Sequence, residues 1–193
     1  MTPKEEFISI FKENITRPGG DKLLHWLEGS DFFIAPASTR FHGNHEGGLV
    51  EHSLQVYKCL VGELDTVDLK TRYTKETVAI VGLLHDICKT NFYVKGFRNV
   101  KENGVWVQKE VYEIKDNFPI GHAEKSVIML QNFMKLDAAE IYAIRAHMGA
   151  FDCAFKGGDQ FLNNIFNQCP LALLLHLSDM KATYIYESNS DEY

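Results

Sequence analysis

The sequence of 193 residues has few cysteines, a shortage of positive charge and no long hydrophobic run. Its 4 cysteines form no Cys-x-x-Cys pair and no regular framework, so neither disulfides nor a thiolate metal site is indicated. No apolar stretch approaches the roughly 18 residues that span a membrane. The charged residues 1–6 form no hydrophobic targeting region. We therefore expect a cytoplasmic protein with reduced thiols and no membrane partner.

The charge balance is acidic, with a formal net charge of −6. Binding of long nucleic acid usually needs several cationic contacts to phosphates, so we do not expect such a partner. The length predicts one domain, 1–193, with helices of residues 1–30 packed on it. The polar tail 188–193 is expected to fray. The sequence does not indicate an oligomeric state.

Hydrophobic periodicity predicts that most of the chain is helical. Glycine and proline make residues 30–48 irregular. We expect the helices at about residues 3–15, 21–27, 49–64, 76–89, from 122 onward, 137–147 and 170–187. Two β-rich arms flank Glu102-Asn103-Gly104, and Asn-Gly is a strong hairpin-turn signal. The sequence thus predicts an all-α protein with one β-hairpin insertion at about residues 92–118.

Two carboxylates stand in apolar surroundings. Asp86 follows His85 at the end of the apolar run 78–84, and Asp179 ends the apolar run 171–178. An ionised Asp on an apolar helix is disfavoured unless a cation or hydrogen bonds compensate its charge. A bound metal is the simplest compensation, since imidazoles also lie on predicted core-facing segments.

Six side chains of types that bind divalent cations are candidates for this centre. They are His52, His85, Asp86, His122, His147 and Asp179. We expect the His-Asp pair, His52 and Asp179 to hold one ion, and His122 and His147 to hold a second with Asp86 as the bridge. Imidazole and carboxylate suit Mn²⁺, Fe²⁺, Co²⁺, Ni²⁺ or Zn²⁺, and carboxylate-rich sites accept Mg²⁺. One or two ions of undetermined identity are therefore expected. Structural alternatives stay open for His122, at a helix start, and His147, at a helix end.

The order of these residues resembles the HD-domain metal-dependent phosphohydrolases, in particular their two-metal branch. The resemblance covers about residues 36–187 and is carried by Gly47-Gly48-Leu49-Val50-Glu51-His52-Ser53, Leu83-Leu84-His85-Asp86-Ile87-Cys88-Lys89, Gly121-His122-Ala123-Glu124 and His176-Leu177-Ser178-Asp179. These strings look most like the HD domain of bacterial 3′-5′ exoribonucleases and like small phage-type HD hydrolases. Cys88 stands where the family commonly has Gly, and the separate OB-fold of the exoribonucleases has no counterpart here. The implied fold is an HD-type helical bundle.

The resemblance implies hydrolysis of a phosphoester of a nucleotide or similar small phosphorylated substrate by metal-activated hydroxide. Asp86 and Lys89 are the expected catalytic residues, with Lys89 neutralising charge that develops on the phosphate. Basic residues are the candidates for substrate binding: Lys89, Arg40, Lys125, Arg145, Arg98 and Lys101. The last two lie on the hairpin, which we expect to overhang the site. Two alternatives remain: a di-iron HD-type oxygenase, which uses the same ligands, and a non-catalytic nucleotide-binding HD domain.

Overall fold

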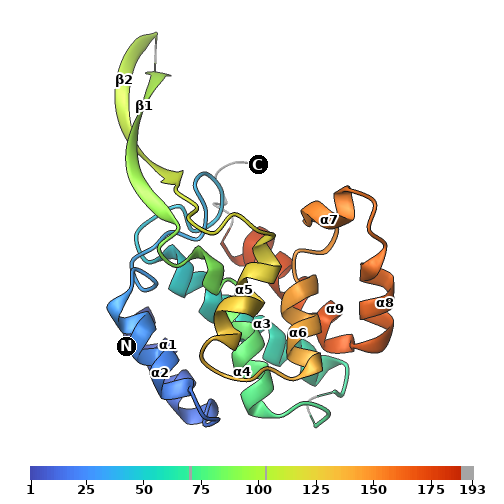
Figure 1. Ribbon diagram of the computed structural model, residues 1–193. Coiled ribbons are helices and arrows are strands. Elements are labelled where there is room, and N and C mark those ends of the chain that lie inside the picture. The colour runs from blue at the N-terminus through green and yellow to red at the C-terminus, as the bar shows by residue number, and fades with distance from the viewer. Residues whose placement is uncertain (70, 103, 188–193) are drawn as a thin grey trace.

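The computed structural model describes residues 1–69, 71–102 and 104–187, so the predicted tail 188–193 lies outside the described residues. The helices are α1 (Pro3–Asn14), α2 (Gly20–Gly29), α3 (Gly48–Thr66), α4 (Lys75–Leu84), α5 (His122–Gln131), α6 (Ala138–Ala146), α7 (Cys153–Lys156), α8 (Phe161–Gln168) and α9 (Pro170–Lys181). Short 3₁₀ or π turns are η1 (Ile87–Lys89), η2 (Gly149–Phe151) and η3 (Ala182–Tyr186), and the strands are β1 (Tyr93–Glu102) and β2 (Val105–Ile114). The predicted all-α architecture with one β-hairpin is confirmed: the helices form a body from which the two strands project (Figure 1).

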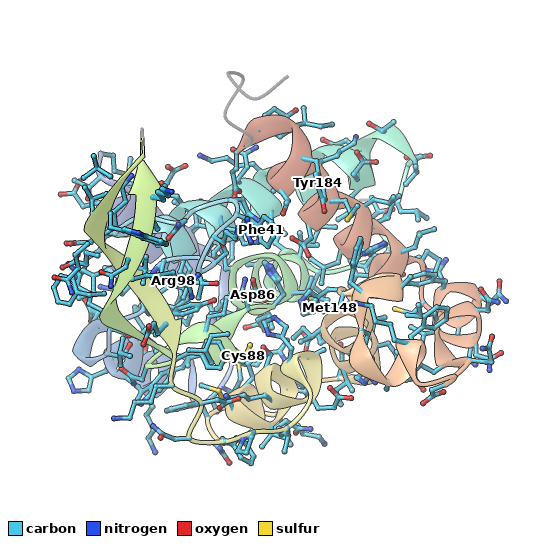
Figure 2. The ribbon with its side chains drawn as sticks, turned by 90° about the horizontal axis from the view of Figure 1, so that it is seen from above. Phe41, Asp86, Cys88, Arg98, Met148 and Tyr184 are labelled. Atoms are coloured by element: carbon cyan, nitrogen blue, oxygen red, sulfur yellow. The ribbon has the colours of Figure 1, made fainter. Side chains whose placement is uncertain are left out.

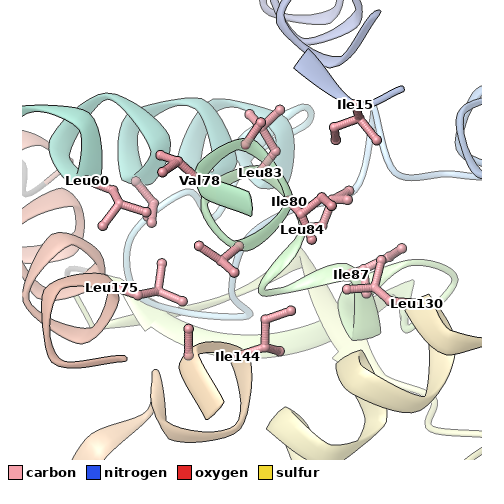
Figure 3. Close-up of a cluster of buried hydrophobic side chains, with 14 of the residues drawn as sticks. Ile15, Leu60, Val78, Ile80, Leu83, Leu84, Ile87, Leu130, Ile144 and Leu175 are labelled. Carbon is pink, nitrogen blue, oxygen red and sulfur yellow. The ribbon is translucent and has the colours of Figure 1, made fainter. Parts of the chain in front are cut away.

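Helix α4 occupies the centre of the helical body. Every side chain from Thr77 to Leu84 is buried, as expected for a helix that is apolar on all sides. Helices α1, α3 and α6 contact it, and Figure 3 shows its side chains among apolar groups of the surrounding helices. At Gly82 a Cβ atom would lie 2.9 Å from the Cα of Tyr57, so the glycine permits close approach of α3. The first and second helices join the same core through Phe7 and Leu23.

Helix α4 ends earlier than the sequence predicts. Instead of running to Lys89, it stops at Leu84, and His85 is its C-cap. Asp86 leaves helical geometry, with φ −103° and ψ 19°. The backbone N–H of Lys89 then donates to the carbonyl of Asp86 at 2.9 Å, which closes the tighter turn η1. The His-Asp pair therefore lies at a break in the helix, where two adjacent side chains can face one point.

The ribbon of β1 and β2 stands apart from the helical body. The strands pair antiparallel from Tyr93↔Ile114 to Glu102↔Val105. Within the described part of the chain, none of the buried core side chains comes from either strand. The ribbon projects away from the helices, which differs from the expected overhang because no core contact draws it over the body (Figure 1). Its base is fixed by the Tyr93 hydroxyl, which donates to the carbonyl of Ala37 at 3.3 Å.

Among the described helices, none combines the length and apolarity needed to cross a bilayer.

Candidate metal centre

Segments from all parts of the helical body bring the predicted ligands together. His52 lies near the start of α3, the His-Asp pair follows α4, His122 begins α5, and His147 caps α6. Asp179 belongs to α9. Neighbouring imidazole centroids are 5.4 Å apart for His52 and His85, 5.1 Å for His85 and His147, and 5.5 Å for His122 and His147. The structure thus gathers the six side chains at one place, while their role as ligands stays a prediction.

The carboxylate of Asp86 lies at the middle of this group. Its Oδ1 is 2.6 Å from His122 Nε2 and 3.4 Å from His147 Nε2. Its Oδ2 is 3.6 Å from His85 Nε2, 3.7 Å from His52 Nε2 and 2.6 Å from the Lys89 Nζ. Each oxygen therefore faces a different pair of imidazoles, as the arrangement with Asp86 between two ions requires. Figure 2 shows Asp86 between Met148 on one side and Arg98 of the ribbon on the other.

The imidazoles are oriented as metal ligands commonly are. The Nδ1 atoms of His85 and His147 lie 3.0 and 2.6 Å from the carbonyls of Gly82 and Ile144. A carbonyl only accepts, so both Nδ1 atoms carry the proton and both Nε2 atoms keep a free lone pair. Among the described residues, the buried Nε2 atoms of His52, His85 and His147 have no hydrogen-bond partner. The two buried lone pairs of His85 and His147, with His52 Nε2 beside the same carboxylate, fit a divalent cation, which would satisfy all three nitrogens.

Glu187 is a contributor that the sequence analysis missed. Its carboxylate oxygens lie 3.0 and 3.1 Å from His52 Nδ1 and accept its proton. On the opposite side of the ring, His52 Nε2 is 3.2 Å from Asp179 Oδ1. Burial lowers the pKa of His52, but the two carboxylates outweigh it and raise the value to about 9. A cation on Nε2 would take the place of that second proton.

His42, from the loop before α3, is a second residue that the sequence analysis left unassigned. Its ring centroid is 4.8 Å from that of His52, and both of its ring nitrogens are buried without a described hydrogen-bond partner. Burial, assisted by the charge of His52, lowers its pKa to about 4, so the imidazole is neutral. The Gly-rich loop signals only a turn region, and nothing in its pattern distinguishes a buried imidazole from a solvated one.

Charge at the site is arranged around Asp86. Its burial would raise its pKa, but Lys89 and the surrounding imidazoles hold the value well below its ordinary range. Burial would lower the pKa of Lys89, and the Asp86 carboxylate more than reverses this. Burial lowers the pKa of His85 to about 3, so this ring stays neutral with its lone pair available. The site thus combines an ionised carboxylate, a cationic lysine and a neutral imidazole.

Cys88, the departure from the family pattern, contacts the candidate centre. Its Sγ is 3.3 Å from Nδ1 and 3.6 Å from Nε2 of His122. Burial would lower the pKa of His122, whereas Cys88 and Asp86 together raise it to about 10. The thiol therefore takes the place that a backbone carbonyl has beside His85 and His147.

A cavity of about 200 Å³ opens beside these residues. It is lined by Asp86, Lys89, His122, His147 and Asp179 of the predicted set and by His42, Met148, Phe151, His176, Met180, Thr183 and Tyr184. Among the predicted substrate-binding residues, Lys89 therefore has direct access to it.

The other predicted basic residues lie elsewhere. Lys125 is buried, pairs with Asp116 and sits 4.8 Å from the ring centroid of Phe92. Arg145 pairs with Glu124 at 2.7 Å and with Asp152 at 3.1 Å. Arg40 is exposed in the loop before α3, and Arg98 and Lys101 are on β1. None of these five side chains is among the described residues that line the cavity at Asp86, so the structure gives no contact through which they would reach a substrate there.

Comparison with known proteins places this geometry in a family. The model of the HD domain family matches residues 49–181, which include all six predicted ligands. The chain belongs to the HD domain family. This confirms the family expected from the sequence.

Part of this HD domain is also similar to a phosphodiesterase. The dihydroneopterin 2′,3′-cyclic phosphate phosphodiesterase of Methanocaldococcus jannaschii is 29% identical over 92 residues, which are 47% of this chain and 34% of that protein. The match thus spans about a third of the relative's length. No solved structure matches the chain.

Proposed function

We propose that this protein is a metal-dependent phosphohydrolase that cleaves a phosphoester of a nucleotide or a similar small phosphorylated compound. One observation carries the proposal: the buried Asp86 carboxylate faces unpartnered imidazole nitrogens and lies 2.6 Å from the Lys89 ammonium at a cavity wall. Family membership and the relative named as a cyclic phosphate phosphodiesterase support it.

One divalent cation would be held by His52, His85, Asp86 and Asp179. A second would be held by Asp86, His122 and His147. When bound, such a cation lowers the pKa of a coordinated water toward neutrality and polarises phosphoryl oxygens. The buried protein ligands keep bulk water away from the reacting groups, which strengthens electrostatic interactions there.

Lys89 has the charge and the position to act on a phosphate. Its pKa is raised by Asp86, so it is cationic at neutral pH, and its side chain is 13% exposed, at the cavity. We infer that its ammonium binds a phosphoryl oxygen and stabilises negative charge in the transition state. The cavity volume of about 200 Å³ suits a phosphoryl group with part of its ester, which favours small substrates over polymers.

The test is a hydrolysis screen of phosphomonoesters and phosphodiesters, nucleotides and cyclic nucleotides among them, with Mn²⁺, Co²⁺, Ni²⁺ and Mg²⁺ compared. Release of phosphate or of a monoester that depends on the added metal supports the proposal. Oxygen consumption that requires iron would instead support the oxygenase alternative. Nucleotide binding by a metallated protein that hydrolyses none of the panel would support the non-catalytic one.

Two substitutions separate metal binding from catalysis. Asp86→Ala is expected to abolish hydrolysis and reduce bound metal, because it removes the shared carboxylate. Lys89→Ala is expected to lower kcat by about 10²- to 10³-fold with bound metal retained, the usual loss for one group that stabilises transition-state charge. Lys58→Ala is the matched control, since Lys58 is half exposed and pairs with Glu6 away from the cavity. Full activity of Lys89→Ala would contradict the role given to Lys89.

A further inference from the structure

A second hollow adjoins the cavity at Asp86. Its volume is about 400 Å³, and it shares His122, Met148 and Phe151 with the first cavity. The remaining wall includes Gly121, Glu124 and Asp152. The two hollows therefore meet along one edge, and a molecule with its phosphoester near Asp86 can extend into the second, which we call the side hollow.

The segment with Met148 and Phe151, which separates the two hollows, is attached to the candidate metal centre. It begins at His147, whose carbonyl accepts a hydrogen bond from His176 Nδ1 at 2.6 Å. The turn η2, which follows His147, packs directly on the His176 ring. Its first residue, Gly149, has φ +52°, and a Cβ atom there would be 2.4 Å from His176 Cε1. The turn ends at Asp152, which is buried and accepts from Arg145 Nη1 at 3.1 Å and from the backbone N–H of Ala154 at 2.8 Å. Both ends of the turn are thus anchored.

Phe151 stands between these anchors, and half of it is exposed. A large aromatic ring at a cavity edge offers a flat apolar surface for stacking. The Lys156 Nζ lies over this ring, 5.7 Å from its centroid. A preformed platform of this kind loses little conformational freedom when a planar ligand binds.

The charges of the two hollows differ. The cavity at Asp86 is lined by the Lys89 ammonium together with the Asp86 and Asp179 carboxylates, and the proposed cations would add positive charge there, whereas the side hollow has the carboxylates of Glu124 and Asp152 in its wall. Both carboxylates already pair with Arg145, so they are held in place. An anionic group is therefore favoured next to Lys89 and the proposed cations, whereas the described wall of the side hollow offers it no lysine or arginine, which sets the direction in which a substrate would lie.

We propose that the side hollow binds the planar heteroaromatic part of the substrate by stacking on Phe151, while the phosphoester lies at Asp86 and Lys89. This inference rests on the proposed function and adds a substrate class to it: phosphoesters that carry a base-like ring are preferred over those that carry only a sugar or a polyol.

The experiment measures equilibrium binding of adenosine 5′-phosphate and ribose 5-phosphate, each as its non-hydrolysable phosphonate analogue, to the Mn²⁺-loaded protein by calorimetry. The wild type is expected to bind the nucleotide more tightly by about 5- to 150-fold, the range that stacking of one base on an aromatic side chain supplies. Phe151→Ala should remove this preference and leave the affinity for ribose 5-phosphate unchanged, and Phe151→Trp should retain it. Phe97→Ala, an exposed phenylalanine of the ribbon, is the matched control.

The outcomes are distinguishable. Equal affinities of the wild type for the two ligands, or an equal loss for both in Phe151→Ala, would overturn the subsite and leave the proposed function intact. Failure of the wild type to bind either phosphate would overturn the subsite as proposed, whereas the proposed function is decided separately by the hydrolysis screen. Because half of Phe151 is exposed, its replacement is expected to leave folding unchanged, which thermal unfolding of each variant checks.

Discussion

The imidazoles of the candidate centre are oriented through their Nδ1 atoms in two different ways. His85 and His147 each donate to a carbonyl three residues earlier, so the helix that carries the ligand also orients it. His52 instead donates to Glu187, 135 residues away. The orientation of His52 therefore depends on the segment after α9, whereas that of the other two is local.

Glu187→Gln is expected to lower the affinity for the metal by about 10- to 100-fold, as loss of an acceptor behind a ligating histidine commonly does. The amide is neutral and no longer polarises the imidazole of His52. Titration of the metal-free protein with Mn²⁺ or Zn²⁺ measures the change without reference to activity. Glu63→Gln is the control, because Glu63 pairs with Lys181 outside the centre. Equal metal affinities of Glu187→Gln and the wild type would exclude this role.

The sequence predicted the six candidate ligands and missed Glu187 for a physical reason. The ligands stand out because histidines and carboxylates interrupt apolar helix faces, and that contrast is visible along the chain. Glu187 lies beyond η3, where a backbone hydrogen bond to Ala182 spans five residues and changes the direction in which the chain turns. Such a π turn has no clear signature in hydrophobic periodicity. His42 was left unassigned because burial of a loop depends on what packs over it.

At the scale of elements, a buried ion pair links three helix ends far from the cavity. Glu140, at the start of α6, is fully buried and accepts two hydrogen bonds of 2.7 Å from Arg17, which lies between α1 and α2. The hydroxyl of Thr77 in α4 donates to the same carboxylate at 3.0 Å. This cluster fixes the N-terminal end of α6, whose other end carries His147.

Arg17→Met is expected to lower the free energy of unfolding by about 3–5 kcal/mol, because it leaves a buried carboxylate without its cation. Urea unfolding followed by circular dichroism measures the change. Adding Glu140→Gln to this variant should recover part of the loss, since the remaining buried group is then neutral. Lys58→Met, which breaks the exposed pair with Glu6, should cost less than about 1 kcal/mol. An Arg17→Met protein as stable as the wild type would show that the pair contributes nothing.

The ribbon is an element whose existence the sequence predicted and whose direction it did not. Asn-Gly and the two β-rich arms specify the hairpin locally, but its orientation depends on packing, and its strands pair only with each other among the described residues. Helices α7 and α8 were likewise not predicted, because they have only 4 and 8 residues, too few for a hydrophobic period to stand out. Local signals thus specified elements well, and boundaries such as that at Asp86 poorly.

Charge reversal on the ribbon tests whether it contacts the substrate. Arg98 and Lys101 lie five and eight residues after Tyr93 at the ribbon's base, about 17 and 27 Å along an extended strand. A small phosphoester in the cavity does not reach that far, so Arg98→Glu with Lys101→Glu is expected to leave KM and metal content unchanged. Steady-state kinetics with a small substrate measures this. A raised KM with normal metal content would show instead that the ribbon bends over the cavity.

At the scale of the whole molecule, the candidate centre joins α3, the end of α4, α5, α6 and α9. Each contributes at least one of the six side chains, and the same helices enclose the hydrophobic core. A cation held there would therefore connect most of the helical body, and the unfolded chain, with its ligands scattered over more than a hundred residues, would bind it weakly.

Metal removal is consequently expected to destabilise the fold. At a free concentration of 100 times Kd, a ligand that binds only the native state stabilises it by about 2.7 kcal/mol. For a chain of this size this corresponds to a rise in Tm of about 5–10 °C over the chelator-treated protein. Asp86→Ala should lose most of this metal-dependent rise, whereas Lys89→Ala should keep it, because Lys89 is placed to contact substrate rather than metal. Calorimetry with and without Mn²⁺ measures all three proteins. The same Tm for the wild type in chelator and in Mn²⁺ would mean that the buried imidazoles bind no cation that stabilises the fold, and the unpartnered nitrogens around Asp86 would then need another explanation.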